Sequence, residues 1–466
     1  MSFFAKTALQ VVSYCVGCLL ATAVVLRMIV YAIRKGPRTL FSMKKRPSPP
    51  TCMQDPSLGV HGFAHLEDIR LHYVSNGSED KPLMLLVHGF PEFWYSWRHQ
   101  LREFKDDYRV VAVDQRGYGD SDKPTSVADY TVDKLANDLR QLIPALGYKK
   151  CVLVGHDWGG MAAWALAQTC PEMVDRLIIM NCPSTQAYSK HAASGFSQLK
   201  KSWYFSLFQV PYIPELNMRR SDMAVLKNLF TGRVMGLKSG VMSDEDVEAY
   251  KYTFQRGGFT APINYIRALI RYPDFAFSRL TSPDLKVTCP TLIIWGCQDG
   301  ALDTEMAALS AETVSGEVTV KYIEDCSHWT EMDQPELLQA RSLLVVLVVV
   351  VMVMETEAWW NRYRHIAKAK KTKPQKLQAI AKKLAQDTSD GRRKRSVGLD
   401  DVTVDEIEDL ESVCCDIYSL MDDNQHVDME ALTQFFHFVD DSNPDPIAAG
   451  DGNLNGEELG QFGNIL

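Results

Sequence analysis

The sequence predicts an α/β fold, in which helices flank a mostly parallel sheet and a helical lid is inserted before the last strands. Helix-prone stretches such as 131–146 and 160–170 lie between short apolar runs, and this alternation is typical of βαβ units. Between 181 and 290 the strand pattern gives way to amphipathic and aromatic stretches, which predict a lid over about 184–285. Continuous apolar, often β-branched runs suit strands buried on both faces, and they occupy 83–88, 109–114, 151–156, 176–181, 291–296 and 318–323.

Length and composition limit the classes of protein to which this chain can belong. At 466 residues the chain is long for one domain, so we expect one large domain, over 59–340, with extensions. A net charge of -8 without a dominant basic face gives no indication of nucleic-acid binding. The eleven cysteines lack the spacing of a metal site or a disulfide framework, which mildly favours a reducing environment. We expect no metal and no cofactor.

Residues 7–33 are almost continuously apolar and long enough to span a bilayer as a helix. A cleaved signal peptide has a shorter apolar core and a small-residue cleavage site, whereas basic residues follow this run, so we expect a retained anchor. Lys6 alone precedes it, and the basic, Pro-rich linker 34–58 follows. The positive-inside rule then places the large domain on the cytoplasmic side, and we expect the endoplasmic reticulum. The sequon at Asn76 would matter only on the lumenal side.

The stretch VGHDWGG (154–160) predicts a nucleophile. Asp157 directly follows an apolar strand and precedes an Ala-rich helix, while Gly155 and Gly159 allow the backbone to turn sharply. This is the strand–turn–helix frame of a nucleophile elbow, with a carboxylate in the usual serine position. Helix capping is the alternative role for Asp157, although the whole motif favours a nucleophile. A carboxylate nucleophile forms an ester, which water must then hydrolyse with the help of a general base.

The predicted base is His328, which follows the last apolar run, 318–323. An acid must orient its second nitrogen; we predict Asp299, with Asp303 as the alternative. The order nucleophile, acid, histidine is that of the α/β-hydrolase fold. Upstream, HGFPEFW begins after a strand, and we expect the backbone N–H groups of Phe90 and Trp158 to form an oxyanion hole.

Together these motifs resemble the α/β-hydrolase-fold epoxide hydrolases, and with the N-terminal segment the chain is similar to their membrane-anchored type. The resemblance covers about residues 55–340 and rests on HGFPEFWYSW, DQRGYGDSDKP, GHDWGG, WGCQDGALD and SHWTEMDQPE. It implies that the Asp157 carboxylate opens a small-molecule epoxide to a hydroxyalkyl ester. His328, oriented by Asp299, then activates water and a vicinal diol leaves. A position beside the bilayer makes lipid-derived epoxides the expected substrates.

The resemblance also implies two lid tyrosines that donate protons to the epoxide oxygen. The first is Tyr204, in WYFSLFQVP. At the second position this chain has Ile266, and Tyr265 stands one place earlier. One residue turns a side chain by about 100° around a helix, so two roles stay open for Tyr265: a second proton donor displaced by one position, or packing within the lid.

Two other functions remain open. A haloalkane or haloacid dehalogenase uses the same Asp–His–Asp set but stabilises a leaving halide with N–H donors, one of which Trp158 offers. A catalytically weak homologue with an interaction role is the third hypothesis. Tyr204 and the N-terminal segment favour the epoxide, and the intact Asp157, Asp299 and His328 argue against a loss of activity.

The C-terminal part does not resemble the hydrolases. The Val-rich run 341–354 is short for a membrane span, so a buried segment is the preferred interpretation. Residues 355–466 form a charged extension to which the sequence assigns neither a role nor a partner. Residues 451–459 have part of the spacing of a calcium loop, but Phe462 stands where a glutamate ligand is needed, so calcium binding is not expected.

Overall fold

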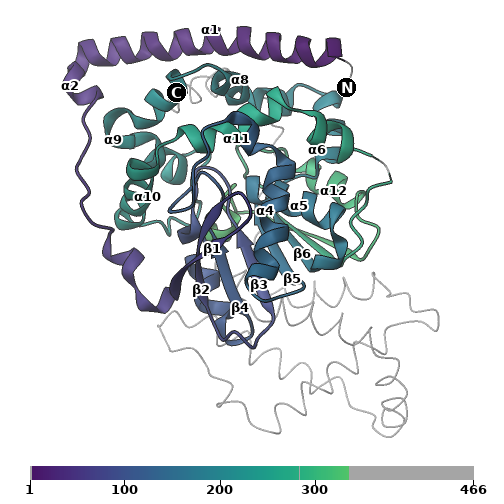
Figure 1. Ribbon diagram of the computed structural model, residues 1–466. Helices are drawn as coiled ribbons and strands as arrows, with labels where there is room; N and C mark the ends of the chain where they lie inside the picture. The colour runs from purple at the N-terminus through teal and green to yellow at the C-terminus, as the bar shows by residue number, and fades with distance from the viewer. Residues whose placement is uncertain (1–2, 283, 335–466) are drawn as a thin grey trace, which may run out of the picture. The chain divides into compact units, whose positions relative to one another are not determined.

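The computed structural model of the chain describes residues 3–282 and 284–334. Its centre is an eight-stranded sheet in the order β1-β2-β4-β3-β5-β6-β7-β8, flanked by helices (Figure 1). The predicted fold class is confirmed, and all six predicted strands form. The Val-rich run and the C-terminal extension lie outside the described residues. The strands are β1 Val60–His65, β2 Arg70–Asn76, β3 Leu83–Val87, β4 Arg109–Val113, β5 Cys151–His156, β6 Val174–Met180, β7 Thr291–Gly296 and β8 Val318–Ile323.

The six predicted strands pair in parallel, so their carboxyl ends meet at one edge of the sheet. In β3, β4, β5 and β7 every residue is buried, which explains why their sequences are continuously apolar. The first two strands, β1 and β2, are antiparallel additions at one end of the sheet. Most of β1 is exposed, so it lacks the continuous apolar run that marks the other strands.

Helices connect the strands and pack on the sheet. Two of them were expected from the sequence: α4 (Val132–Ala145) and α5 (Asp157–Thr169), which pack against each other. The first turn of α5 continues directly from β5, so this helix begins at the carboxyl end of a central strand. The remaining helices of the sheet layers are short: α3 Arg98–Glu103, α12 Glu305–Ala311 and α13 Thr330–Asp333.

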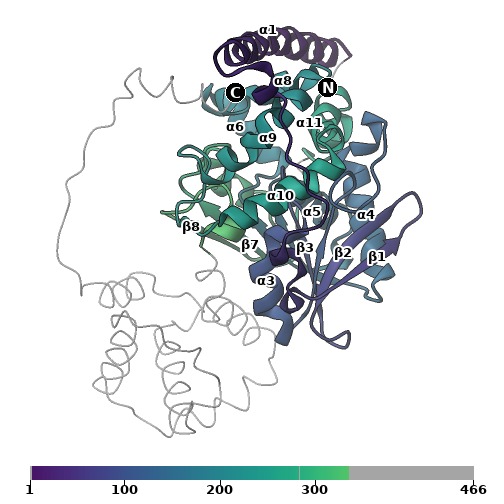
Figure 2. The ribbon, with the colours of Figure 1, turned by 90° about the vertical axis from the view of Figure 1, so that its left-hand side faces the viewer.

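Between β6 and β7 the chain leaves the sheet and forms the lid, which covers the carboxyl ends of the strands (Figures 1 and 2). Local signals define its elements; α10, for example, begins with a capping box in which Ser243 and Asp246 exchange side-chain and backbone hydrogen bonds. The lid helices are α6 Thr185–Ser194, α7 Ser197–Lys201, α8 Trp203–Gln209, α9 Ile213–Thr231, α10 Asp244–Gly257 and α11 Thr260–Arg271.

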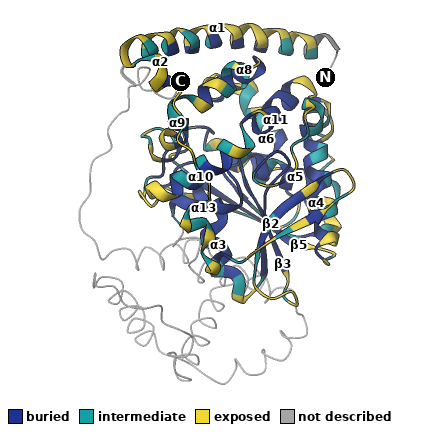
Figure 3. Cartoon of the chain, turned by 60° about the vertical axis from the view of Figure 1, so that its left-hand side comes forward, coloured by how far each residue is buried: buried dark blue, intermediate teal, exposed yellow. Residues whose placement is uncertain are grey.

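The N-terminal helix α1 (Phe3–Lys35) is long and apolar enough, over Lys6–Lys35, to cross a membrane. One face contacts the lid helix α8, where a Cβ added at Gly17 would lie 2.2 Å from the Ser206 carbonyl oxygen. The side-chain amide of Gln10 also donates to the Arg271 carbonyl oxygen of α11 at 3.0 Å. The opposite face of α1 is exposed (Figure 3). This helix therefore has a specific, close-packed face toward the lid and an apolar face that is left uncovered.

Candidate active site

The sharp turn between β5 and α5 positions Asp157. Its φ of 47° lies in the left-handed region, which non-glycine residues adopt only where the surroundings enforce it. A Cβ added at Gly159 would lie 2.0 Å from the Val87 carbonyl oxygen, and one at Gly155 would lie 2.6 Å from the Gly159 carbonyl oxygen. Glycine is therefore required at both positions for β3, β5 and α5 to approach this closely. The turn leaves the Asp157 carboxylate at the positive end of a helix.

A backbone donor from the loop after β3 meets this carboxylate. The Phe90 N–H donates to Asp157 Oδ1 at 2.8 Å. Trp158, the other expected oxyanion donor, lines the same pocket, although its N–H makes no hydrogen bond to Asp157 among the described residues. The contact from Phe90 fixes one carboxylate oxygen and leaves Oδ2 facing His328.

His328 lies between two carboxylates. Its Nδ1 is 2.8 Å from Asp299 Oδ2, and its Nε2 is 3.7 Å from Asp157 Oδ2. Burial disfavours the imidazolium, but the Asp299 and Asp157 carboxylates outweigh burial and raise the pKa of His328 to about 10. Between these two carboxylates the histidine favours its protonated form at neutral pH.

The structure brings Asp299, not the alternative Asp303, to His328. Asp299 is itself held in place: Oδ1 accepts from the Ala301 N–H at 2.7 Å, and Oδ2 accepts from the Asn181 side-chain amide at 2.6 Å. Asp303 instead contacts His191 at 2.9 Å. Sequence reasoning missed Asn181, whose only signal is its position directly after a buried strand.

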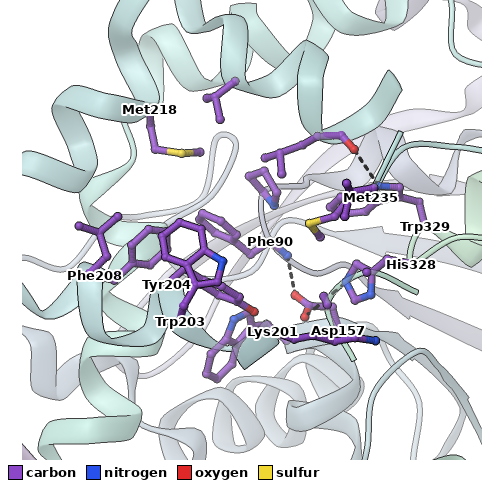
Figure 4. A pocket seen from close by; sticks show the side chains of 18 of the residues that line it. Phe90, Asp157, Lys201, Trp203, Tyr204, Phe208, Met218, Met235, His328 and Trp329 are labelled. Atoms are coloured by element: carbon purple, nitrogen blue, oxygen red, sulfur yellow. Dashed lines mark hydrogen bonds and ion pairs between the residues drawn. The ribbon is translucent and has the colours of Figure 1, made fainter. Parts of the chain in front are cut away.

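Of the two expected lid tyrosines, one reaches the pocket. Tyr204, on α8, lines the pocket together with Asp157 and His328 (Figure 4). Burial and the nearby Asp157 carboxylate raise the pKa of Tyr204 well above its usual value, so its hydroxyl keeps its proton. Tyr204 thus lines the pocket with a protonated hydroxyl.

Tyr265 does not reach the pocket. Its hydroxyl donates to the Arg116 carbonyl oxygen at 2.7 Å, and its ring packs edge-on against those of Tyr118 and Trp158. Ile266, at the position expected for a tyrosine, is buried and does not line the pocket either. The shift of one position turns the Tyr265 side chain toward the loop after β4. Among the described residues that line the pocket, Tyr204 is the single tyrosine.

The pocket between sheet and lid has a mainly apolar lining (Figure 4). Sequence reasoning did not identify this lining, because most of it comes from lid helices without a motif. An apolar wall with a few convergent polar groups is typical of a small-molecule site. Its apolar residues include Pro91, Trp203, Leu207, Phe208, Met218, Val225, Leu229, Val234 and Met235.

Two clusters in the described part of the chain have side chains close enough to share a cation: Glu92, His156 and Glu331; and His191, Asp303 and Glu305. In the second cluster Asp303 already pairs with Lys201, at 3.1 Å, and with His191. The ion pairs account for the second cluster. The first lies directly behind His328 and is considered below.

Comparisons with known proteins agree with this geometry. Residues 82–335 match the family model of the alpha/beta hydrolase fold. Human epoxide hydrolase 4 is 43% identical over 329 residues, which is 70% of this chain and 89% of that protein. Epoxide hydrolase 1 of Caenorhabditis elegans is 45% identical over 303 residues, which is 64% of this chain and 72% of that protein.

Among solved structures, a mutant epoxide hydrolase from Bacillus megaterium complexed with its product superposes with a TM-score of 0.56 at 32% identity. The match covers 61% of this chain and 99% of the bacterial one. The predicted family resemblance is confirmed: the chain belongs to the epoxide hydrolases of the alpha/beta hydrolase fold.

Proposed function

We propose that the enzyme hydrolyses small-molecule epoxides to vicinal diols through an ester on Asp157. The observation that carries this proposal is the placement of Asp157, His328 and Tyr204 on one apolar pocket, with Asp299 bound to His328 behind it. Such a pocket suits an apolar epoxide, and burial there strengthens each electrostatic contact with the reacting atoms.

In the first step, Asp157 Oδ2 attacks an epoxide carbon while Oδ1 stays bound to the Phe90 N–H. The carbon–oxygen bond of the ring breaks, and the epoxide oxygen takes the proton of Tyr204. A dehalogenase has no use for this donor, because a halide leaves without a proton. Tyr204 in the pocket therefore favours an epoxide as the substrate.

Formation of the ester removes the negative charge of Asp157, which is one of the groups that raise the pKa of His328. The pKa of His328 then falls, and its proton returns to Tyr204 through solvent. Neutral His328 is now a base beside the ester that it must hydrolyse. The charge on Asp157 thus keeps the base protonated until the ester has formed.

In the second step, His328 Nε2 removes a proton from water, which attacks the ester carbon of Asp157. Negative charge develops on Oδ1, where the Phe90 N–H stabilises it, and Asp299 stabilises the imidazolium. The bond between Asp157 Cγ and Oδ2 then breaks, and the departing diol oxygen takes from His328 the hydrogen that came from water. The other hydrogen of the water restores the Asp157–His328 ion pair, so that the cycle closes without net proton transfer.

We further propose that α1 anchors the enzyme in an internal membrane, the endoplasmic reticulum, with the catalytic domain in the cytoplasm. The excess of basic residues after α1 supports this orientation. In the folded domain the Asn76 side-chain amide donates to the carbonyl oxygens of Ser57, at 2.8 Å, and Leu101, at 3.0 Å, so a glycan on this sequon would cost both bonds. Proximity to lipid makes lipid-derived epoxides the expected substrates.

Topology is tested with a new sequon. Gly195 lies on an exposed loop, where an added Cβ meets no atom within 4 Å, and G195N creates the sequon Asn-Phe-Ser with Phe196 and Ser197. With a cytoplasmic domain, G195N expressed with microsomes shows no glycosidase-sensitive shift in mass. A sequon-bearing tag before Met1 should be glycosylated in the same preparation. Glycosylation of G195N would place the domain in the lumen and contradict the assignment.

The covalent step is tested with H328Q, which keeps the nucleophile but removes the base. We expect turnover to fall by about 10²–10⁴-fold, the usual contribution of a general base. The unhydrolysed ester should accumulate on the peptide that contains Asp157, as detected by mass spectrometry. H191Q serves as the matched control, because His191 pairs with Asp303 away from the pocket. A fully inhibited H328Q enzyme that forms no adduct would contradict an ester intermediate.

The two tyrosines are distinguished by removing their hydroxyls. Y204F should slow ester formation by about 10²–10⁴-fold, since it removes the proton donor. Y265F should leave the rate of ester formation within about twofold and lower the free energy of unfolding by about 1 kcal/mol, because its hydroxyl bonds Arg116. Single-turnover rates and thermal unfolding measure the two effects. Equal losses of activity in both variants would refute the assignment of Tyr204 as the donor.

A further inference from the structure

A second buried cluster of titratable groups lies behind His328. Glu92, His156 and Glu331 have no exposed surface, and one nitrogen or oxygen atom of each lies within 4.8 Å of the others. The chemical steps on Asp157 do not use these groups. Burying two carboxyl groups beside one imidazole is costly unless their charges and hydrogen bonds are balanced.

Glu92 and His156 connect three loops of the active site. Glu92 Oε2 accepts from the Gly89 N–H at 2.6 Å and lies 2.7 Å from His156 Nδ1. His156 Nε2 lies 2.8 Å from the His328 carbonyl oxygen and must carry a proton, because a carbonyl oxygen only accepts. The contact joins the Gly89–Phe90 turn, the strand that ends at Asp157 and the loop of His328. The position of the base therefore depends on this chain of bonds.

Glu331 is the unexplained member of the cluster. It lies on α13, three residues after His328, and its backbone carbonyl oxygen accepts from the Gln100 side chain at 2.9 Å. Its Oε2 is 3.4 Å from His156 Nδ1. In the described part of the chain, however, neither carboxyl oxygen of Glu331 has a hydrogen-bond partner, and Glu92 Oε1 also lacks one. The cluster thus contains three buried carboxyl oxygens without a hydrogen-bond partner among the described residues.

A proton on Glu331 resolves the imbalance. The charged or titratable groups near its carboxyl are Glu92, His156, Arg98 of α3, Tyr250 of α10 and Cys326 of the loop before His328. The Arg98 guanidinium also lies 3.6 Å from Asp246. Two buried carboxylates this close cannot both ionise without a large cost. A protonated Glu331 offers an O–H group to Glu92 and removes the second charge. Burial and the charge of Glu92 raise the pKa of Glu331 well above its usual value, while His156 outweighs burial and lowers that of Glu92.

We propose that Glu331 is a positioning residue that holds a proton and donates it to Glu92, so that Glu92 and His156 fix the His328 loop relative to Asp157. This inference rests on the proposed function, because the loop carries the base that hydrolyses the Asp157 ester. Glu331 touches neither substrate nor nucleophile. Its effect should therefore fall on ester hydrolysis more than on ester formation.

The first test compares two variants of nearly equal size. E331Q keeps a donor to Glu92, whereas E331M removes it. Rapid-quench measurements give the rates of ester formation and ester hydrolysis separately. We expect the rate of ester hydrolysis to stay within about threefold of the parent in E331Q and to fall by about 10–100-fold in E331M. The rate of ester formation should change by less than about threefold in both variants. Equal hydrolysis by E331M and the parent would refute a positioning role. A loss in E331Q as large as in E331M would mean that the ionised carboxylate, not the acid, is required.

The second test does not depend on activity. A raised pKa in the folded state means that the stability contributed by protonated Glu331 is fully present below the unfolded pKa of about 4.3 and is lost as the pH rises. Glutamine does not titrate, so the melting temperature of E331Q minus that of the parent should increase steadily from pH 5 to pH 9. A difference in melting temperature that stays constant or decreases would contradict the proposal that Glu331 is protonated in the folded protein. The melting measurement tests the proton on Glu331 even if the enzyme turns over no epoxide. A lack of epoxide turnover would instead contradict the proposed function.

Discussion

The left-handed turn at Asp157 is the constraint on which the rest of the site depends. It requires glycine at 155 and 159, because β3, β5 and α5 come too close for side chains at those positions. This turn makes the Asp157 carboxylate project from the point where the central strand β5 ends and the helix α5 begins. The parallel order β3-β5-β6-β7-β8 then brings the loops after five neighbouring strands together, and these loops supply Phe90, Asp157, Asn181, Asp299 and His328.

Charge balance connects the parts of this site. Asp157 and Asp299 place two carboxylates on the ring of His328, while Glu92 and His156 hold its backbone from behind. Both carboxylates favour protonation of the ring, so loss of the Asp157 charge lowers the pKa of His328. An ester on Asp157 therefore changes the acid–base state of His328 without any movement of the backbone. Such coupling needs a buried site, since water would screen the charges.

The sequence was sufficient to predict the fold class and the six parallel strands, because continuous apolar runs separated by helical stretches have few other solutions. It did not reveal β1 and β2, whose exposed positions break that pattern. The proposed nucleophile, acid and base follow strand ends, so a linear pattern was enough to select them, although their roles stay predictions. The direction of Tyr265 and the contacts of Asn181 and Glu331 depend on how distant loops and lid helices pack, and no short motif encodes that packing.

The central claim is that water attacks the Asp157 ester and not the epoxide itself. The most direct measurement is a single turnover in water labelled with the heavy oxygen isotope, with enzyme in excess over an epoxy-fatty acid, followed by mass analysis of the diol and of the Asp157 peptide. The account predicts an unlabelled diol, whose new oxygen comes from the carboxylate, and a peptide that gains one heavy oxygen. A labelled diol together with an unlabelled Asp157 peptide would show direct attack by water and would contradict the account.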